Sequence, residues 1–355
     1  MSSLVGVSRV APGYLVLRTR FFSARVHGRR LLLLLSALLL ALAVAGLSLC
    51  FGDVRIPPAA VWHTIIAGGP HARVVLGWRF PVSLAALVFG ALLALGGAIV
   101  QSLTKNPLGS PDIIGFDAGS YTGVVLTILV LGHETLAWTA PAALLGGLLT
   151  ALLVYVLSYR RGVAGFRLII VGIGVSAILG SINAYVITRA HVDDAMLVGF
   201  WAAGSITRVT WQSLMPALIA AAALCVVLVP LSRWLVALEI GDDAAATHGV
   251  PVGVARLALM VLGVATSAIV TASAGPIGFI ALAAPQVARR VFRTPGVSLV
   301  GSAIVGAGLL SGAHLLSLLT SQLYRAVPVG IMTMIIGGVY LLVLLIRQSR
   351  KGVSQ

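Results

Sequence analysis

Long apolar runs without a charged residue recur along the chain and are separated by short polar segments. A helix needs about 20 apolar residues to cross a bilayer, and most of these runs reach or approach that length. Each run is therefore predicted to form a membrane-spanning helix. The nine runs are 31–52, 80–104, 118–132, 135–159, 168–188, 209–232, 257–288, 294–324 and 326–346.

The run 257–288 is too long for one crossing and holds Gly275-Pro276 at its middle. A Gly-Pro pair favours a turn, so we expect one full helix and one short helix there, which gives ten crossings. Both chain ends are basic, and only an even number of crossings places them on one side. We predict a basic cytoplasmic tail over 1–29, a ten-helix domain over 30–347 and a cytoplasmic tail over 348–355.

Composition supports a membrane protein and excludes several other classes. Hydrophobic residues make up 59% of the chain and charged residues only 9%, with a mean hydropathy of +1.08. So few charges cannot cover a water-soluble surface, which excludes a soluble enzyme and a disordered protein. The net charge of +15 lies at the termini and between the apolar runs. That placement indicates membrane topology and contact with lipid rather than nucleic-acid binding.

Two outer segments and one inner loop lie between the predicted spans. Residues 56–69 begin with a Pro-Pro pair and favour a short interfacial helix, and residues 193–207 form the second outer segment. The largest inner loop is 233–256. Its acidic start at Asp242 and Asp243, three alanines and a stop at Gly249 predict a short helix on the inner face. This helix is either a docking element for a partner or a structured connector.

Closely spaced glycines are predicted to mark contacts between helices, because small residues let helices approach closely in lipid. A hinge is the alternative at any one of them. The glycines are Gly90, Gly96, Gly97, Gly146, Gly147, Gly172, Gly174, Gly180, Gly301, Gly306, Gly308, Gly312, Gly337 and Gly338.

No pattern of a catalytic or cofactor site occurs in the sequence. The G-x-x-x-x-G-K-[ST] phosphate loop is absent, the seven histidines are scattered, and neither cysteine has a metal-ligand spacing. The apolar runs also lack the mid-membrane carboxylate that ion-coupled carriers use. We therefore expect no enzyme activity and no cofactor. The energy for transport is then expected to come from a partner, or the protein is a passive channel or an ion-coupled carrier.

Several stretches, in order across nearly the whole chain, resemble the FecCD family, the permease subunits of ABC importers for ferric siderophores, haem and vitamin B12. They look most like the second permease of ferric-enterobactin-type systems. The stretches are 79–81, 84–97, 101, 106–109, 115–119, 166–172, 201–205, 238–251, 274–282, 285, 289–290, 328–330 and 337–338.

The resemblance implies an all-α polytopic fold of about ten helices, the type II importer permease fold of the vitamin B12 transporter. It also implies a set of partners in the bacterial cytoplasmic membrane: a second permease subunit, two ATP-binding subunits, and a substrate-binding lipoprotein or periplasmic protein. An iron siderophore is the expected cargo, with cobalamin or haem as the alternative.

The same resemblance implies roles for individual residues. The inner helix fits a cleft of the ATPase, and the pathway closes near the inner end. Outer arginines dock the binding protein through acidic residues, with Arg79 placed by the family pattern and the other three by location alone. The implied residues are Glu239, Gly241, Asp242, Asp243 and Gly249 for ATPase coupling; Gly165, Phe166, Asn106 and Pro107 for the gate; and Arg79, Arg73, Arg208 and Arg325 for docking.

Three positions depart from the family pattern. Val82 stands where a second arginine is usual, Gln286 replaces a histidine, and His248 replaces a leucine before Gly249. The first departure puts the docking geometry in question, and the other two are expected to follow the choice of partner subunit.

Overall fold

The computed structural model describes residues 6–11, 14–18, 23–112, 115–158, 165–323 and 327–352. Three strands precede the helices: β1 (Gly6–Ala11), β2 (Tyr14–Arg18) and β3 (Ser23–His27) form an antiparallel sheet in the order β1-β2-β3. The sequence predicted only a basic tail in this region. The expectation of an all-α chain therefore holds for the described residues from Gly28 onward.

Every predicted span corresponds to a described helix, and the long run 257–288 divides at Gly275 as expected. The other segments form α2, α7 and α9, and a π-helical segment η1 leads directly into α3. The helices are α1 (Gly28–Ser48), α2 (Pro58–Ala67), η1 (Arg73–Arg79), α3 (Phe80–Thr104), α4 (Phe116–Leu129), α5 (Leu136–Ser158), α6 (Gly165–Thr188), α7 (Val192–Ala202), α8 (Trp211–Ile240), α9 (Asp242–Thr247), α10 (Val252–Ala274), α11 (Ile280–Phe292), α12 (Leu299–Leu323) and α13 (Val329–Gly352).

Two boundaries differ from the sequence analysis. The inner loop is shorter than 233–256, because α8 continues to Ile240 and α10 already begins at Val252. Likewise α13 continues to Gly352, so the expected C-terminal tail starts as helix. In both places a helix extends past the end of the apolar run, since backbone hydrogen bonding does not require apolar side chains.

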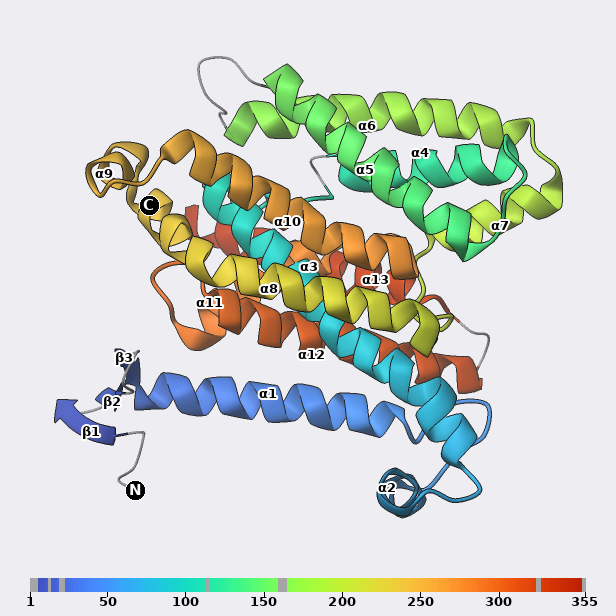
Figure 1. The fold of residues 1–355 in the computed structure, drawn as a ribbon, viewed down its shortest axis with the longest axis horizontal. Helices are drawn as coiled ribbons and strands as arrows, with labels where there is room; N and C mark the ends of the chain where they lie inside the picture. The colour runs from blue at the N-terminus through green and yellow to red at the C-terminus, as the bar shows by residue number, and fades with distance from the viewer. Residues whose placement is uncertain are drawn as a thin grey trace.

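The long helices run roughly side by side, and the short elements gather at opposite ends of the bundle (Figure 1). One end carries β1–β3, the start of α1 and α9, at the left of Figure 1; we call it the α9 end. The other carries α2 and α7 and is called the α2 end. Seven described helices are long and apolar enough to cross a membrane: α1, η1 with α3, α5, α6, α8, α10 and α12.

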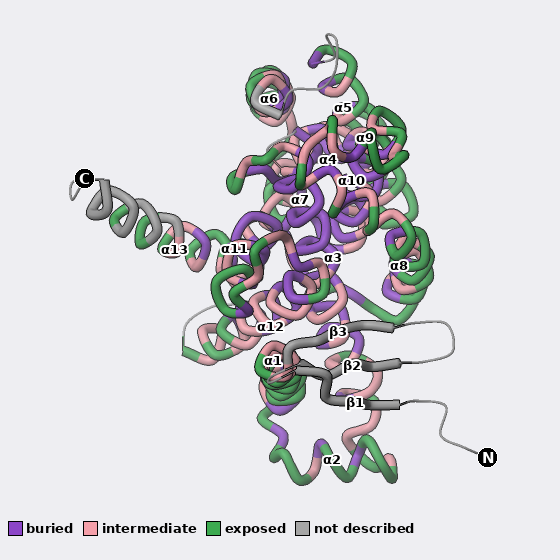
Figure 2. The backbone as a smooth tube through the Cα atoms, turned by 90° about the vertical axis from the view of Figure 1, so that its left-hand side faces the viewer, coloured by how far each residue is buried: buried purple, intermediate pink, exposed green. Residues whose placement is uncertain are grey.

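Helix α3 forms the centre of the bundle and is mostly buried, whereas α1, α6 and α8 expose much of their surface (Figure 2). It packs against α12, α10, α11 and α8. Glycines permit the close approach: a Cβ on Gly97 would lie 1.7 Å from the Ala281 carbonyl oxygen, and a Cβ on Gly90 would lie 2.3 Å from that of Gly306.

The predicted glycine contacts are confirmed at most positions but not at all of them. Gly146 packs on Gly119 across the α4–α5 contact, and Gly337 packs on the Phe279 ring. By contrast, a Cβ on four of the predicted glycines would meet nothing within 4 Å in this chain. Those four are Gly174, Gly180, Gly312 and Gly338.

Candidate functional site at the α9 end

Helix α9 is a short, firmly attached helix between α8 and α10. Gly241 at its start has φ +151°, and Gly249 after its end has φ +76°, both conformations that favour glycine. Asp242 accepts two hydrogen bonds from Nη2 of Arg256 on α10, at 2.9 and 3.0 Å. Asp243, in contrast, is exposed. The predicted helix is therefore confirmed, and its first turn is tied to α10.

Glu239 lies next to α9 in the chain but faces the interior of the bundle. Its Oε1 accepts hydrogen bonds from Ser102 Oγ on α3 and from the backbone N–H of Val297, each at 3.1 Å. A Cβ at Gly296 would lie 2.5 Å from Oε2, so the segment before α12 closes tightly over the carboxylate. Glu239 thus joins the end of α8 to α3 and to the α11–α12 connection.

The Asn106-Pro107 turn is fixed to α11 through two glutamine side chains. Gln286 Nε2 donates to Gln101 Oε1 at 2.8 Å and to the Pro107 carbonyl at 3.5 Å. Gln101, which is buried on α3, donates in turn to the Leu282 carbonyl at 3.0 Å. The two hydrogens of the Gln286 amide serve both acceptors, which is the structural consequence of its departure from the family pattern.

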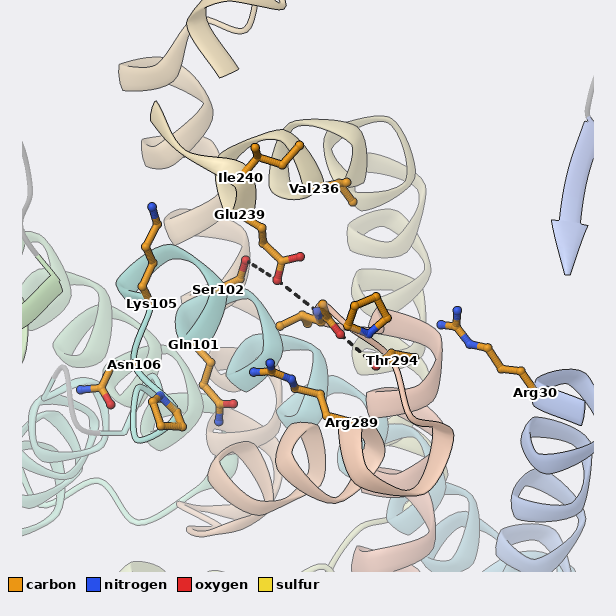
Figure 3. Close-up of a pocket in the computed structure, with 14 residues that line it drawn as sticks. Arg30, Gln101, Ser102, Lys105, Asn106, Val236, Glu239, Ile240, Arg289 and Thr294 are labelled. Atoms are coloured by element: carbon orange, nitrogen blue, oxygen red, sulfur yellow. Dashed lines mark hydrogen bonds between the residues drawn. The ribbon is translucent and has the colours of Figure 1, made fainter. Parts of the chain in front are cut away.

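A cavity of about 560 Å³ brings three of the predicted residues together: Glu239, Asn106 and Pro107 (Figure 3). Arg30, Lys105 and Arg289 also line it. None of these three was among the predicted site residues, although Lys105 is one of two lysines in the chain and that scarcity was a usable signal. The remaining coupling residues, Gly241, Asp242, Asp243 and Gly249, do not line the cavity.

The structure describes only the backbone of Gly165 and Phe166, the two predicted gate residues. Both residues form the start of α6, and their side chains lie outside the described part of the chain. No group of three or more His, Cys, Asp or Glu side chains is placed to hold a metal ion within the described ranges.

The three predicted docking arginines that the structure describes do not form one cluster. Arg79 points inward and donates to the Leu49 carbonyl at 2.9 Å and to the Val54 carbonyl, so it holds the α1–α2 connection. Arg73 lies over the Trp78 ring at 6.0 Å. Arg208 lines a separate cavity of about 470 Å³, and Arg325 lies outside the described residues.

Val82, the first departure from the family pattern, is buried in the core around α3. A charged arginine at this position would need a partner or a path to water. Val82 therefore contributes to the apolar packing of α3, where an arginine would not fit without such a partner. His248, the third departure, is exposed at the end of α9.

The sequence model of the FecCD transport family matches residues 32–347. The chain belongs to the FecCD transport family. It is 41% identical to the ferric enterobactin transport system permease protein FepG of Escherichia coli (strain K12), over 91% of this chain and 98% of that protein. It is 31% identical to the probable siderophore transport system permease protein YfhA of Bacillus subtilis (strain 168), over 93% of this chain and 98% of that protein.

A solved structure shares the fold of this FecCD-family chain. It is described as an inward-facing conformation of a metal-chelate type ABC transporter, and it superposes with a TM-score of 0.76. The match covers 89% of this chain and 99% of the solved chain at 25% sequence identity. The helical architecture from α1 to α13 is therefore that of a permease.

Proposed function

We propose that this protein is the membrane-spanning permease subunit of an ATP-driven importer of ferric siderophores in the bacterial cytoplasmic membrane. The 41% identity to a ferric enterobactin permease, along nearly the whole of both chains, is the observation that carries the proposal. Matches to iron(3+)-hydroxamate and iron(3+) dicitrate permeases of E. coli point to the same class of cargo. Cobalamin or haem remains the alternative cargo within the class.

The chain supplies the pathway, and a separate subunit supplies the energy. Its sequence has no phosphate loop, so ATP is hydrolysed by two partner ATPase subunits. A second permease completes the pathway, and a substrate-binding protein delivers the chelate. The α9 end faces the cytoplasm in this proposal. The proposal has ten crossings: the seven helices of membrane-spanning length together with α4, α11 and α13.

Helix α9 is proposed to contact the ATPase. It projects at one end of the bundle, and Asp242 anchors it to α10 while Asp243 remains exposed for a partner. Movement of α9 would act on α3 through Glu239 and Ser102, because these side chains connect the end of α8 to the central helix. A rigid-body tilt of packed helices is the type of change that this attachment permits.

Uptake of radioactive iron tests the proposal. In a strain lacking the gene, the wild-type chain should restore uptake from one or more of a panel of siderophores. Replacing both Gly241 and Asp242 with alanine should lower uptake about tenfold, within the usual range of a coupling free energy, while the amount of protein in the membrane stays unchanged. Thr188→Ala, an exposed threonine at the end of α6 and away from α9, is the control and should transport normally.

Two results would contradict the proposal. Uptake that continues in cells without the ATPase would indicate a channel or a carrier, and uptake of labelled cobalamin or haem in place of iron would change the cargo. Normal uptake and normal ATPase association in the Gly241 and Asp242 double variant would remove the role of α9 alone.

A further inference from the structure

Cationic side chains from three elements surround the cavity at the α9 end (Figure 3). Arg30 belongs to the first turn of α1, Lys105 follows the end of α3, and Arg289 lies in the last turn of α11. Glu239 is the one acidic residue among the described residues of the lining, and its Oε1 already accepts two hydrogen bonds. The cavity therefore has an excess of positive charge.

Two of the three cations have no protein partner among the described residues. Arg30 donates to Ser298 Oγ at 3.2 Å. For Lys105 and Arg289, no described side chain or carbonyl accepts a hydrogen bond or forms an ion pair. Both are exposed at the cavity and free to contact an anion.

The backbone conformation of Lys105 is unusual for a lysine. Lys105 caps α3 in the left-handed conformation, with φ 50° and ψ 30°. Glycine or asparagine is the usual residue at such a cap, and other residues are less stable there. The chain nevertheless places one of its two lysines at this position. Retention of a strained residue with a free charge indicates that the charge has a use.

Apolar surface lies directly beside the charges. Val236 and Ile240 on α8, which also line the cavity, are 59% and 71% exposed, and Leu32 on α1 is 68% exposed. The cavity lies where two apolar helices of membrane-spanning length meet, at the start of α1 and the end of α8. A ligand that fits both surfaces has a phosphate group and hydrocarbon chains.

We propose that this cavity binds the headgroup of an anionic phospholipid, with Lys105 and Arg289 contacting its phosphate and the acyl chains lying against the exposed faces of α1 and α8. Basic pockets between membrane helices on the cytoplasmic side are suited to such headgroups. The bound lipid would connect α1, α3 and α11 beside α9. This inference goes beyond the proposed function and does not depend on the transported compound.

Lipid retention tests the inference on the full chain. The protein is incorporated into phosphatidylcholine bilayers with or without phosphatidylglycerol, extracted, and analysed by native mass spectrometry. The wild type should retain phosphatidylglycerol in preference to phosphatidylcholine. Lys105→Gln and Arg289→Gln should each lower this retention about fivefold, the effect expected of one cation near an anionic lipid. Arg233→Gln, an exposed charge on α8 outside the cavity, should leave it unchanged.

Lys105→Gly separates binding from folding. Glycine suits the left-handed backbone, so this variant should unfold at the same temperature as the wild type or a higher one while losing the same fraction of bound phosphatidylglycerol. A Lys105→Arg variant, which keeps the charge, should retain as much phosphatidylglycerol as the wild type.

Three results would overturn the inference. The first is unchanged phosphatidylglycerol retention in both Lys105→Gln and Arg289→Gln. The second is displacement of the lipid by millimolar inorganic phosphate, which would identify a site for free phosphate. The third is loss of a co-purifying ATPase subunit in these variants with lipid retention intact, which would assign the cations to a protein partner.

Discussion

The Glu239 carboxylate connects three elements through two hydrogen bonds. Ser102 on α3 and the Val297 N–H both donate to the same oxygen, and Gly296 leaves room for the other. Its position beside Asp242 in the sequence suggests a surface residue of the inner loop, yet its side chain points the opposite way. Adjacent residues at a helix end project in different directions, so neighbouring charges can have unrelated partners.

Replacement of Glu239 should therefore affect stability as well as coupling. Glu239→Ala removes the acceptor of two half-buried donors and should lower the free energy of unfolding by about 1–2 kcal/mol. Glu239→Gln keeps an oxygen acceptor and should lose roughly half as much. Thermal unfolding in detergent measures both. Glu134→Ala, at an exposed position just before α5, is the control; an equal shift in that variant would contradict the role given to Glu239.

At the scale of elements, the packing of α3 depends on positions without a side chain. Gly97 meets the Ala281 carbonyl of α11, and Gly90 and Gly306 approach each other between α3 and α12. The helix can occupy the centre of the bundle because its neighbours contact its backbone directly. Contacts of this kind are common where small residues line helix interfaces in membranes.

Gly97→Ala should disrupt this arrangement, because the new Cβ would overlap the Ala281 carbonyl and neither backbone can move away freely. The free energy of unfolding should fall by about 3 kcal/mol or more, at the upper end of the effects of overpacking. The amount of monodisperse protein recovered in detergent and its unfolding temperature measure the loss. Gly46→Ala, whose Cβ would meet nothing within 4 Å, should behave like the wild type. Equal behaviour of the two variants would show that α3 and α11 are not in contact.

At the scale of the whole molecule, the α9 end and the α2 end present different basic side chains, because they lie at opposite ends of the bundle. The α9 end holds Arg30, Lys105 and Arg289, whereas the α2 end holds Arg79 and the cavity lined by Arg208. By the positive-inside rule, this asymmetry is the reason for proposing that the α9 end faces the cytoplasm.

Cysteine accessibility tests this orientation. In a background with the exposed Cys225 replaced by serine, His63→Cys on α2 should react with a membrane-impermeant thiol reagent in spheroplasts. Thr247→Cys on α9 should react only after the membrane is opened. Both native side chains are exposed, so accessibility reports the side of the membrane and not burial. Labelling of Thr247→Cys in spheroplasts, with His63→Cys reacting only after the membrane is opened, would invert the topology and exclude α9 as the ATPase contact.

The sequence by itself determined the helices, because crossing a bilayer requires long apolar runs and a Gly-Pro turn interrupts them visibly. It also determined α9, whose alanines and terminating glycine are local signals. The partners of residues that act across the fold could not be read from the sequence in this way. Arg79 resembles a docking residue in sequence, but its hydrogen bonds go to backbone carbonyls of the α1–α2 connection.

The tertiary structure alone decided which residues meet. Glu239 pairs with Ser102 and Val297, Gln286 with Gln101, and Lys105 shares a cavity with Arg30 and Arg289. Each of these pairs is far apart in the chain, and hydropathy carries no information on the rotation of one helix against another. That rotation is set by the packing of small residues on α3, so the positions of the polar groups follow from the packed bundle and not from any local pattern.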